Sequence, residues 1–275
     1  MTKTIIYDIG ANNGDDIPYY LLKSDVVVAV EANPLLCDLI RKRFPAEVRS
    51  GRLAIENCVV TAEGESGLID FYIHKSAHVL SQLPAPSNNE AHHYEKVTLS
   101  SRNISEILKQ HGAPYYVKID IEHYDAPILR ALFAAGFFPP FISAESHSIE
   151  VFSVLVTQGH YNAFKLVDGF SVSQEYSACV IATGNLNRLT RYSFPYHSAG
   201  PFGHDIKGRW MRADTFLWVL ALEKLGWKDI HATSNELTGP LPFQGFGKYL
   251  IRYFLRRVQR KMAVFLRSIS LLSRT

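Results

Sequence analysis

Acidic residues and histidines gather in two short stretches of the sequence, each of which reads as the end of a buried strand. They are Asp120, Glu122, His123 and Asp125 in KIDIEHYD, and Glu145 and His147 in SAESHS. Because side chains two residues apart on a strand point to the same face, the two groups would converge if the strands were neighbours. Such a group predicts a general base, His123 or His147 near its working pH, or a Mg²⁺ site formed by Asp120 and Glu145.

Both interpretations have a plainer alternative. Lys118 and Asp120 could form a structural ion pair, and a histidine at a strand end could be a polar surface residue. No stretch has the cysteine and histidine spacing that is typical of a zinc site. The three cysteines, Cys37, Cys58 and Cys179, are scattered and odd in number. They indicate no disulfide framework and favour a reducing cytoplasm.

A glycine-punctuated turn near the start of the chain, YDIGANNGDD at residues 7–16, has the position of a nucleotide-binding turn. A dinucleotide site would need glycine at position 12, where the backbone approaches a pyrophosphate, and Asn12 argues against it. Glu31 follows Gly10 by 21 residues, at the end of the second predicted strand, where a carboxylate can accept hydrogen bonds from both ribose hydroxyls. An adenosine ribose without a pyrophosphate indicates S-adenosylmethionine. The alternatives are a purely structural turn and an NAD-type oxidoreductase that uses the same turn.

Apolar runs along the chain predict the elements that must hold these residues. Strands are expected at 4–9, 25–34, 53–60, 67–74, 115–122, 141–146 and 161–168, and helices at 34–44, 103–112, 125–136, 148–159 and 213–227. Asp15 and Asp16 mark the start of one more helix, whose free N–H groups they are expected to cap. Residues 81–95 are expected to form a surface loop or lid. The alternation predicts an α/β fold with a mainly parallel sheet and helices on both faces.

The sequence resembles the FkbM-type S-adenosylmethionine-dependent methyltransferases in four stretches, YDIGANNGDD, VVAVEANP, NCVV and VKIDIEHYDAPILRAL. Further on, GPFGHDIKGRW and WKDIHA are similar to the C-terminal half of a subset of that family, so the resemblance spans roughly residues 4–232. It implies a class I, Rossmann-like methyltransferase with a seven-stranded sheet. It also implies methyl transfer to oxygen, often on a sugar, a glycan or a secondary metabolite.

The same resemblance implies roles for individual residues. Those that would hold the methionine and ribose portions of the cofactor are Asp8, Gly10, Asn12 and Gly14. Glu31 would bind the ribose hydroxyls, Asn57 would lie on the adenine side, and Asp120 would belong to the same site. The sequence departs from the family at one point, because the family usually has glycine where this chain has His123.

Three parts of the chain are expected: a cofactor-binding methyltransferase core at 1–180, an insertion and C-terminal extension of the same domain at 181–245, and a basic amphipathic helical tail at 246–275. The predicted function is O-methylation of a small molecule or glycan. An NAD-type oxidoreductase, and a non-catalytic cofactor-binding or scaffold protein docked through its tail, are the alternatives. The sequence shows no signal peptide and no apolar run of the roughly 20 residues that span a membrane. A cytoplasmic location is therefore expected. No nucleic-acid partner is expected, because the apolar face of the predicted tail would then have no role.

The predicted tail differs in charge from the rest of the chain. Residues 246–275 hold eight Lys or Arg and no acidic residue, whereas residues 1–245 hold 21 basic and 26 acidic residues, a net charge of −5. On a helix, one face would carry the apolar residues Ile251, Phe254, Leu255, Val258, Met262, Phe265, Leu266, Ile269 and Leu272. Such a helix predicts docking at the inner face of an anionic membrane, and packing on the domain or on a second copy is the alternative.

We expect the full chain to float with vesicles that contain anionic lipid, and a chain truncated to residues 1–245 to stay at the bottom of the gradient. Raising the salt concentration should weaken flotation, because part of the attraction is electrostatic. Equal flotation of the two chains would contradict membrane docking by the tail.

Overall fold

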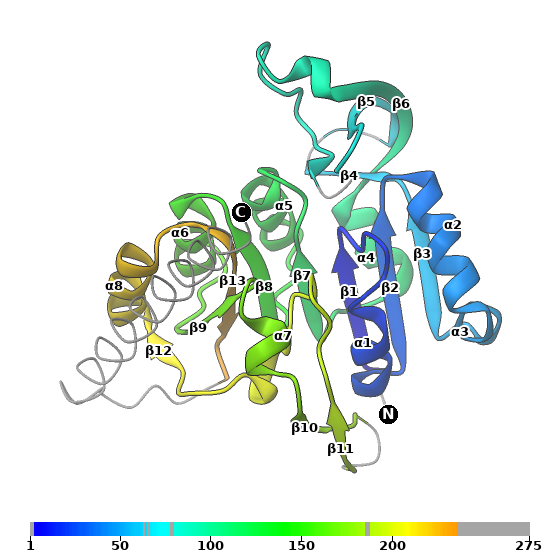
Figure 1. The fold of residues 1–275 in the computed structure, drawn as a ribbon. Coiled ribbons are helices and arrows are strands. Elements are labelled where there is room, and N and C mark those ends of the chain that lie inside the picture. Colours follow the sequence, from blue (N-terminus) through cyan, green and yellow to red (C-terminus); the bar gives the residue numbers. More distant parts are fainter. Residues whose placement is uncertain (1–2, 63, 65, 78–79, 185–187, 236–275) are drawn as a thin grey trace, which may run out of the picture.

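A computed structural model gives the fold and describes residues 3–235 except 63, 65, 78–79 and 185–187. At its centre is an eight-stranded sheet with the strand order β12-β9-β13-β8-β7-β1-β2-β3 (Figure 1). The strands are β1 (Ile5–Ile9), β2 (Val26–Glu31), β3 (Leu53–Asn57), β7 (Tyr116–Ile119), β8 (Phe141–Ser146), β9 (Ala163–Asp168), β12 (Met211–Arg212) and β13 (Gly226–Thr233). Strand β13 is antiparallel to its neighbours β8 and β9, and β12 adds a two-residue antiparallel edge. The remaining strands are parallel, so the predicted mainly parallel sheet of seven strands is confirmed, with β12 as an addition.

Helices cover both faces of the sheet, and successive residues of β1 show why. Ile5 and Tyr7 belong to a core shared with α4, α5, α6 and α8, whereas Ile6 belongs to a second core shared with α1, α2 and α7. The helices are α1 (Ile17–Lys23), α2 (Pro34–Arg43), α3 (Pro45–Ser50), α4 (Ile104–His111), α5 (Asp125–Ala134), α6 (Ile149–Thr157), α7 (Val172–Glu175) and α8 (Ala213–Glu223). A strand that is buried on both faces needs apolar residues at every position, which explains the continuous apolar runs in the sequence.

A second, smaller sheet projects beyond the carboxyl ends of the parallel strands (Figure 1). It consists of β4 (Val59–Thr61), β5 (Gly67–His74) and β6 (Tyr94–Asn103), in the order β4-β6-β5. We call the described residues of 59–103 the arm. The segment between β5 and β6 contains the 3₁₀ helix η2 (Ala91–His93) and lies mostly in the range predicted as a loop or lid.

The chain after α7 forms an extension, defined here as the described residues of 176–207. It contains the hairpin β10 (Cys179–Ala182) and β11 (Leu189–Tyr192), followed by the 3₁₀ helix η3 (Gly203–Asp205). Phe202 stacks on Tyr116 of the sheet, with 4.0 Å between the ring centroids. The extension therefore packs on the same core as α1, although the predicted boundary at residue 180 stays a prediction.

Asp16 fastens the extension, which differs from its predicted role. Its side chain makes no capping hydrogen bond to α1. Instead, its carboxylate accepts hydrogen bonds from the Ser198 hydroxyl and the Ala199 N–H. The prediction that the Asp16 side chain caps the helix is therefore wrong. Its actual partners could not be recognised from the local sequence, because they lie more than 180 residues away.

The last predicted helix, at 213–227, is wrong at its end. Helix α8 stops at Glu223, and Lys224 adopts a left-handed backbone with φ 63°. The chain then turns at Gly226 into β13, so Trp227 belongs to a strand.

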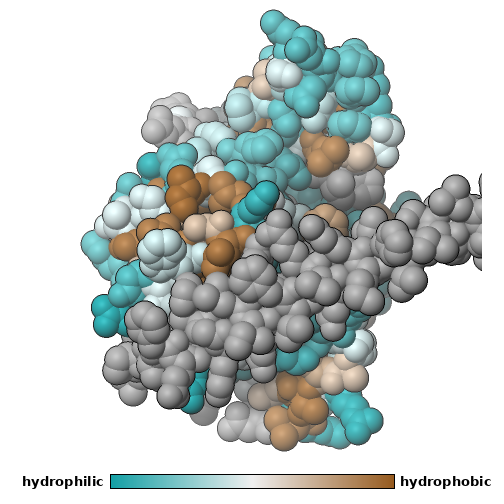
Figure 2. All heavy atoms as spheres, turned by 60° about the vertical axis from the view of Figure 1, so that its left-hand side comes forward, coloured by the Kyte–Doolittle hydropathy of each residue, from teal (hydrophilic) through white to brown (hydrophobic). Residues whose placement is uncertain are grey.

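Apolar side chains gather on the face that carries α6 and α8 (Figure 2). Leu217 and Trp218 of α8 are exposed. Within the described part of the chain, no helix combines the length and the apolar character needed to cross a membrane. The predicted amphipathic tail at 246–275 lies outside the described residues.

Candidate active site

The carboxyl ends of β1, β2, β7 and β8 open onto a cavity of about 640 Å³. The turn after β1 and the residues that follow β2 line one side, and the residues that follow β7 and β8 line another. The arm contributes Phe71, Leu80 and Leu83, and the C-terminal half contributes His197 and Trp227. The cavity is within the size range of sites that enclose small molecules.

The turn after β1 brings the backbone of β1 close to that of β7. Gly10 has φ 85°, and its N–H donates to the Val30 carbonyl at 2.9 Å. A side chain at this position would place its Cβ 1.9 Å from the Asp120 carbonyl oxygen. Only glycine allows both the left-handed backbone and this approach.

Glu31 lies on the cavity wall with both carboxylate oxygens held by backbone donors. Its Oε2 accepts from the Asn12 N–H and its Oε1 from the Asn33 N–H, each at 2.8 Å. Burial raises the pKa of Glu31 to about 7, although these hydrogen bonds lower it. A carboxylate has about four acceptor positions, so the ionised Glu31 can still accept hydrogen bonds from a ligand.

Four residues predicted for cofactor binding line the cavity: Gly10, Asn12, Glu31 and Asp120. The other three lie behind its wall. Asp8 is fully buried, and a Cβ on Gly14 would meet Ile17 and Ile40. Asn57 donates to the carbonyls of Glu31 and Ala32, both at 3.0 Å, so it supports the turn after β2 while the next three residues line the cavity.

Lys118 lies in the cavity floor among three carboxylates. Its Nζ is 3.2 Å from Asp120, 3.4 Å from Asp8 and 4.0 Å from Asp16. Burial disfavours its charge, but these carboxylates keep the pKa of Lys118 well above its ordinary value. Burial also raises the pKa of Asp8 to about 7. The ion pair of Lys118 with Asp120 is therefore present, and Asp120 lines the cavity as well.

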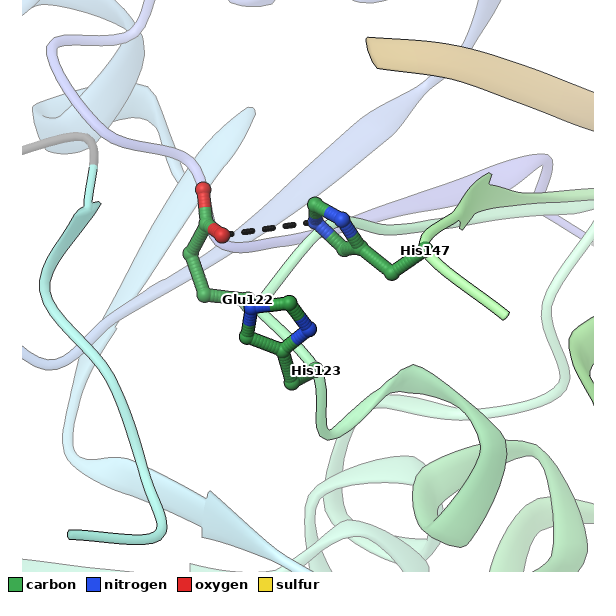
Figure 3. A group of neighbouring side chains, drawn as sticks. All are labelled: Glu122, His123 and His147. Atoms are coloured by element: carbon green, nitrogen blue, oxygen red, sulfur yellow. Dashed lines mark ion pairs between the residues drawn. The ribbon is translucent and has the colours of Figure 1, made fainter. Parts of the chain in front are cut away.

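The two strand-end stretches meet, because β7 and β8 are neighbouring parallel strands. We call Asp120, Glu122, His123, Glu145 and His147 the strand-end group. The Nε2 atom of His147 is 2.8 Å from Glu145 and 3.3 Å from Glu122 (Figure 3). The rings of His123 and His147 have their centroids 4.5 Å apart. The convergence expected from the strand pattern is thus present.

The charges in the strand-end group are unequal. Burial and the neighbouring Asp120 raise the pKa of Glu145 to about 9. Burial opposes ionisation of Asp120 too, but Lys118 outweighs it and lowers the pKa of Asp120 below its ordinary value. Asp120 is therefore the carboxylate that ionises more readily, next to the Glu145 carboxyl, whose pKa is raised.

The pKa of His147 is higher than the pKa expected of a general base near its working pH. Burial disfavours its charge, but the carboxylates of Glu122 and Glu145, within ion-pair distance of its ring, raise the pKa of His147 to about 11. A ring that stays protonated at neutral pH has no free lone pair to accept a proton, which argues against His147 as the base. The corresponding role for His123 stays a prediction.

Trp227 and His197 are among the residues on the cavity wall that were not predicted for the site. Trp227 stacks against His197, with 5.5 Å between the ring centroids, and a Cβ on Gly169 would lie 2.5 Å from the indole. Trp227 was hidden by the overlong helix prediction. The aromatic and glycine-rich composition around His197 indicated an ordered segment but no particular residue.

Comparison with known proteins gives a family for this chain. Residues 8–165, more than half of the chain, match the model of the methyltransferase FkbM domain. This range contains every residue predicted for the site. None of the curated proteins matches the sequence significantly.

Solved structures with a similar arrangement include methyltransferases. The methyltransferase FkbM from Methylobacillus flagellatus KT is 13% identical, with a TM-score of 0.42 over 61% of this chain and 40% of its own length. The chain thus spans less than half of that protein. Precorrin-6y C5,15-methyltransferase from Geobacter metallireducens is 13% identical, with a TM-score of 0.35 over 69% of this chain and 74% of its own. TrmK from M. capricolum, solved with S-adenosyl-homocysteine, is 12% identical, with a TM-score of 0.35 over 95% of this chain and 80% of its own.

We expect Gly10→Ala to destabilise the protein by roughly 3–5 kcal/mol, because left-handed strain adds to the clash with the Asp120 carbonyl. Gly51→Ala is the matched control: Gly51 has φ 74°, but a Cβ there meets nothing within 4 Å. Gly51→Ala should lower the free energy of unfolding only by the backbone strain, about 1–2 kcal/mol. Denaturant midpoints measure both values, and equal losses would contradict the close approach of the turn to β7.

Proposed function

The chain belongs to the methyltransferase FkbM domain family and has the class I, Rossmann-like methyltransferase fold, and on this premise we propose that it transfers the methyl group of S-adenosylmethionine to a hydroxyl group. The proposed acceptor is a sugar, a glycan or a secondary metabolite. The observation that carries the proposal is the Glu31 carboxylate on the cavity wall, which backbone N–H groups hold in place. The family match also favours methyl transfer over the NAD-type alternative.

The residues around Glu31 are suited to an adenosine. Leu36, Cys58, Val59 and Val60 line the cavity next to the Glu31 turn and offer an apolar surface for a flat base. The ionised carboxylate of Glu31 would accept hydrogen bonds from the two ribose hydroxyls. Because both of its oxygens are already fixed by backbone N–H groups, the side chain needs no rearrangement to bind them.

The other end of the cavity is suited to the charged part of the cofactor. S-adenosylmethionine supplies an electrophilic methyl group on a sulfonium, and its methionine portion carries an ammonium. Asp120 is ionised and lines this end, with Asp16 beside it. A negative potential there would favour the sulfonium and the ammonium together.

The acceptor would enter between the arm and the Trp227 wall. Trp227 offers an aromatic face, and Phe71, Leu80 and Leu83 of the arm offer apolar contact. An aromatic face suits the C–H side of a sugar ring, whose hydroxyls would then meet the carboxylates of the strand-end group. Transfer between two bound molecules depends mainly on holding them in line, so these walls are the proposed source of specificity.

We expect Glu31→Gln to weaken S-adenosylhomocysteine binding at pH 8, because the amide replaces one acceptor oxygen with a donor. In the wild-type protein only the ionised Glu31 accepts both hydroxyls, so affinity is full above the pKa of about 7 and is lost as the pH falls through it. Binding at pH 6 should be about tenfold weaker than at pH 8.

Calorimetry between pH 6 and pH 8 measures both effects. The Glu31→Gln variant is the control for the pH dependence, because it has no carboxyl group at position 31 and its affinity should not change as that group ionises. Absence of binding by the wild-type protein would overturn the proposed cofactor. A pH profile that is the same in both proteins would show that another group titrates.

We expect Asp120→Asn to lower the methylation rate of a hydroxylated acceptor by roughly 10²–10⁴-fold, the range typical of a lost acid–base or positioning group. Binding of S-adenosylhomocysteine should fall less, since Glu31 is unchanged. A panel of sugar and glycan acceptors with labelled methyl donor measures the rate, and alkaline stability identifies an ether product. An unchanged rate would contradict the role of Asp120, and label on nitrogen would contradict O-methylation.

A further inference from the structure

Three side chains of the strand-end group form a compact set of metal-binding donors. Glu122, His123 and His147 each place one ligand atom within 4.8 Å of the others. Glu122 and His123 come from the turn after β7, and His147 comes from the end of β8. Figure 3 shows the three side chains directed toward a common point from these two elements.

The backbone of the turn is specialised for this arrangement. Glu122 has φ 43° and His123 has φ 65°, so two successive residues that are not glycine adopt the left-handed region. Residues with a side chain adopt this region at a cost, and such strain concentrates at functional sites. The turn thereby brings a carboxylate and an imidazole from adjacent positions to the same side, facing His147.

The Nε2 atom of His147 provides a second, independent observation. It is buried and makes no hydrogen bond of good geometry, although Glu145 lies 2.8 Å away and Glu122 3.3 Å away. Ligands of one ion with bonds of about 2.1 Å are separated by roughly 3 Å, so both distances fit neighbouring positions in one coordination sphere. An ion between these atoms would replace the proton on Nε2 of His147, because an imidazole binds a metal through a deprotonated nitrogen and metal binding releases that proton.

We propose that Glu122, His123 and His147 bind a divalent transition-metal ion at the solvent-open end of the cavity. Two imidazoles and one carboxylate favour Zn²⁺, Mn²⁺ or Fe²⁺ over Mg²⁺, which prefers oxygen ligands. Glu145, beside His147, either orients that ring or completes the set. The alternative at Asp120 is less suitable, because Asp120 lies 3.2 Å from the buried Lys118 cation.

The use of the ion rests on the proposed function. Three protein ligands leave positions open, and Glu122 and His147 both line the cavity, so the acceptor hydroxyl can occupy one of them. Coordination lowers the pKa of the hydroxyl. Its proton then leaves to solvent as the new O–C bond forms and the S–C bond of the donor breaks, which releases the thioether product.

The test is calorimetric titration of the metal-free full chain with Zn²⁺, together with the visible absorption of the Co²⁺ form. His123→Gly removes one ligand and relieves the left-handed backbone, so it should fold as well as the wild type. We expect it to bind Zn²⁺ at least tenfold more weakly and to lose the Co²⁺ spectrum. Glu122→Gln, which keeps the side-chain size, should show the same loss.

His160→Gly is the matched control, because His160 is an exposed histidine with φ 56° outside the cavity. Its metal binding should equal that of the wild type. No Zn²⁺ binding by the wild type, or affinity unchanged in both His123→Gly and Glu122→Gln, would overturn the site. S-adenosylhomocysteine binding is measured on the same samples: its absence would overturn the proposed function and leave the metal site standing.

Discussion

A single buried ammonium, that of Lys118, holds together the segments that form the cavity floor. It lies between the carboxylates of Asp8 in β1, Asp16 at the start of α1 and Asp120 after β7. These carboxylates would repel one another in a low-dielectric interior without a cation among them, and loss of one partner from a buried ion pair typically costs about 3–5 kcal/mol. The Lys118 ammonium also donates to the Gly10 carbonyl at 3.3 Å, where the turn after β1 approaches the Asp120 carbonyl.

Asp16 connects the Lys118 ion-pair group to the cavity wall that is proposed to contact the acceptor. One side of that carboxylate faces Lys118, and the other accepts hydrogen bonds from Ser198 and Ala199. His197, the residue before Ser198, lies on the cavity wall against Trp227. The ion pairs of Lys118 therefore position both the cavity floor and the wall at His197 and Trp227. The residues of that wall come from a much later part of the chain.

Much of this arrangement follows from local patterns in the sequence. The runs at β1, β2, β7 and β8 are apolar at every position because both faces are buried, so they could be predicted along with the ligand side at their carboxyl ends. Glu31 and the strand-end group were found by the same reasoning. The chain departs from the resembled family at His123, and the structure assigns that position a left-handed backbone.

What could not be predicted depends on partners that are distant in the sequence. Asp16 looks like a helix cap until Ser198 is placed beside it. The protonated state of His147 depends on Glu122, which approaches from the turn after β7. Helix α8 ends where Lys224 turns left-handed, and no helix-breaking residue stands before that point.

The position of β13 sets an order of events for a chain emerging from the ribosome. This strand forms hydrogen bonds with β8 on one side and β9 on the other, yet it is made last of the three. About 65 residues separate the end of β9 from the end of β13, which at 5–20 residues per second is roughly 3–13 s of translation. During that interval β8 and β9 present two unpaired, apolar edges that invite pairing with other nascent chains. The gap between β8 and β9 in the middle of the sheet is therefore closed only after a strand made later in synthesis becomes available.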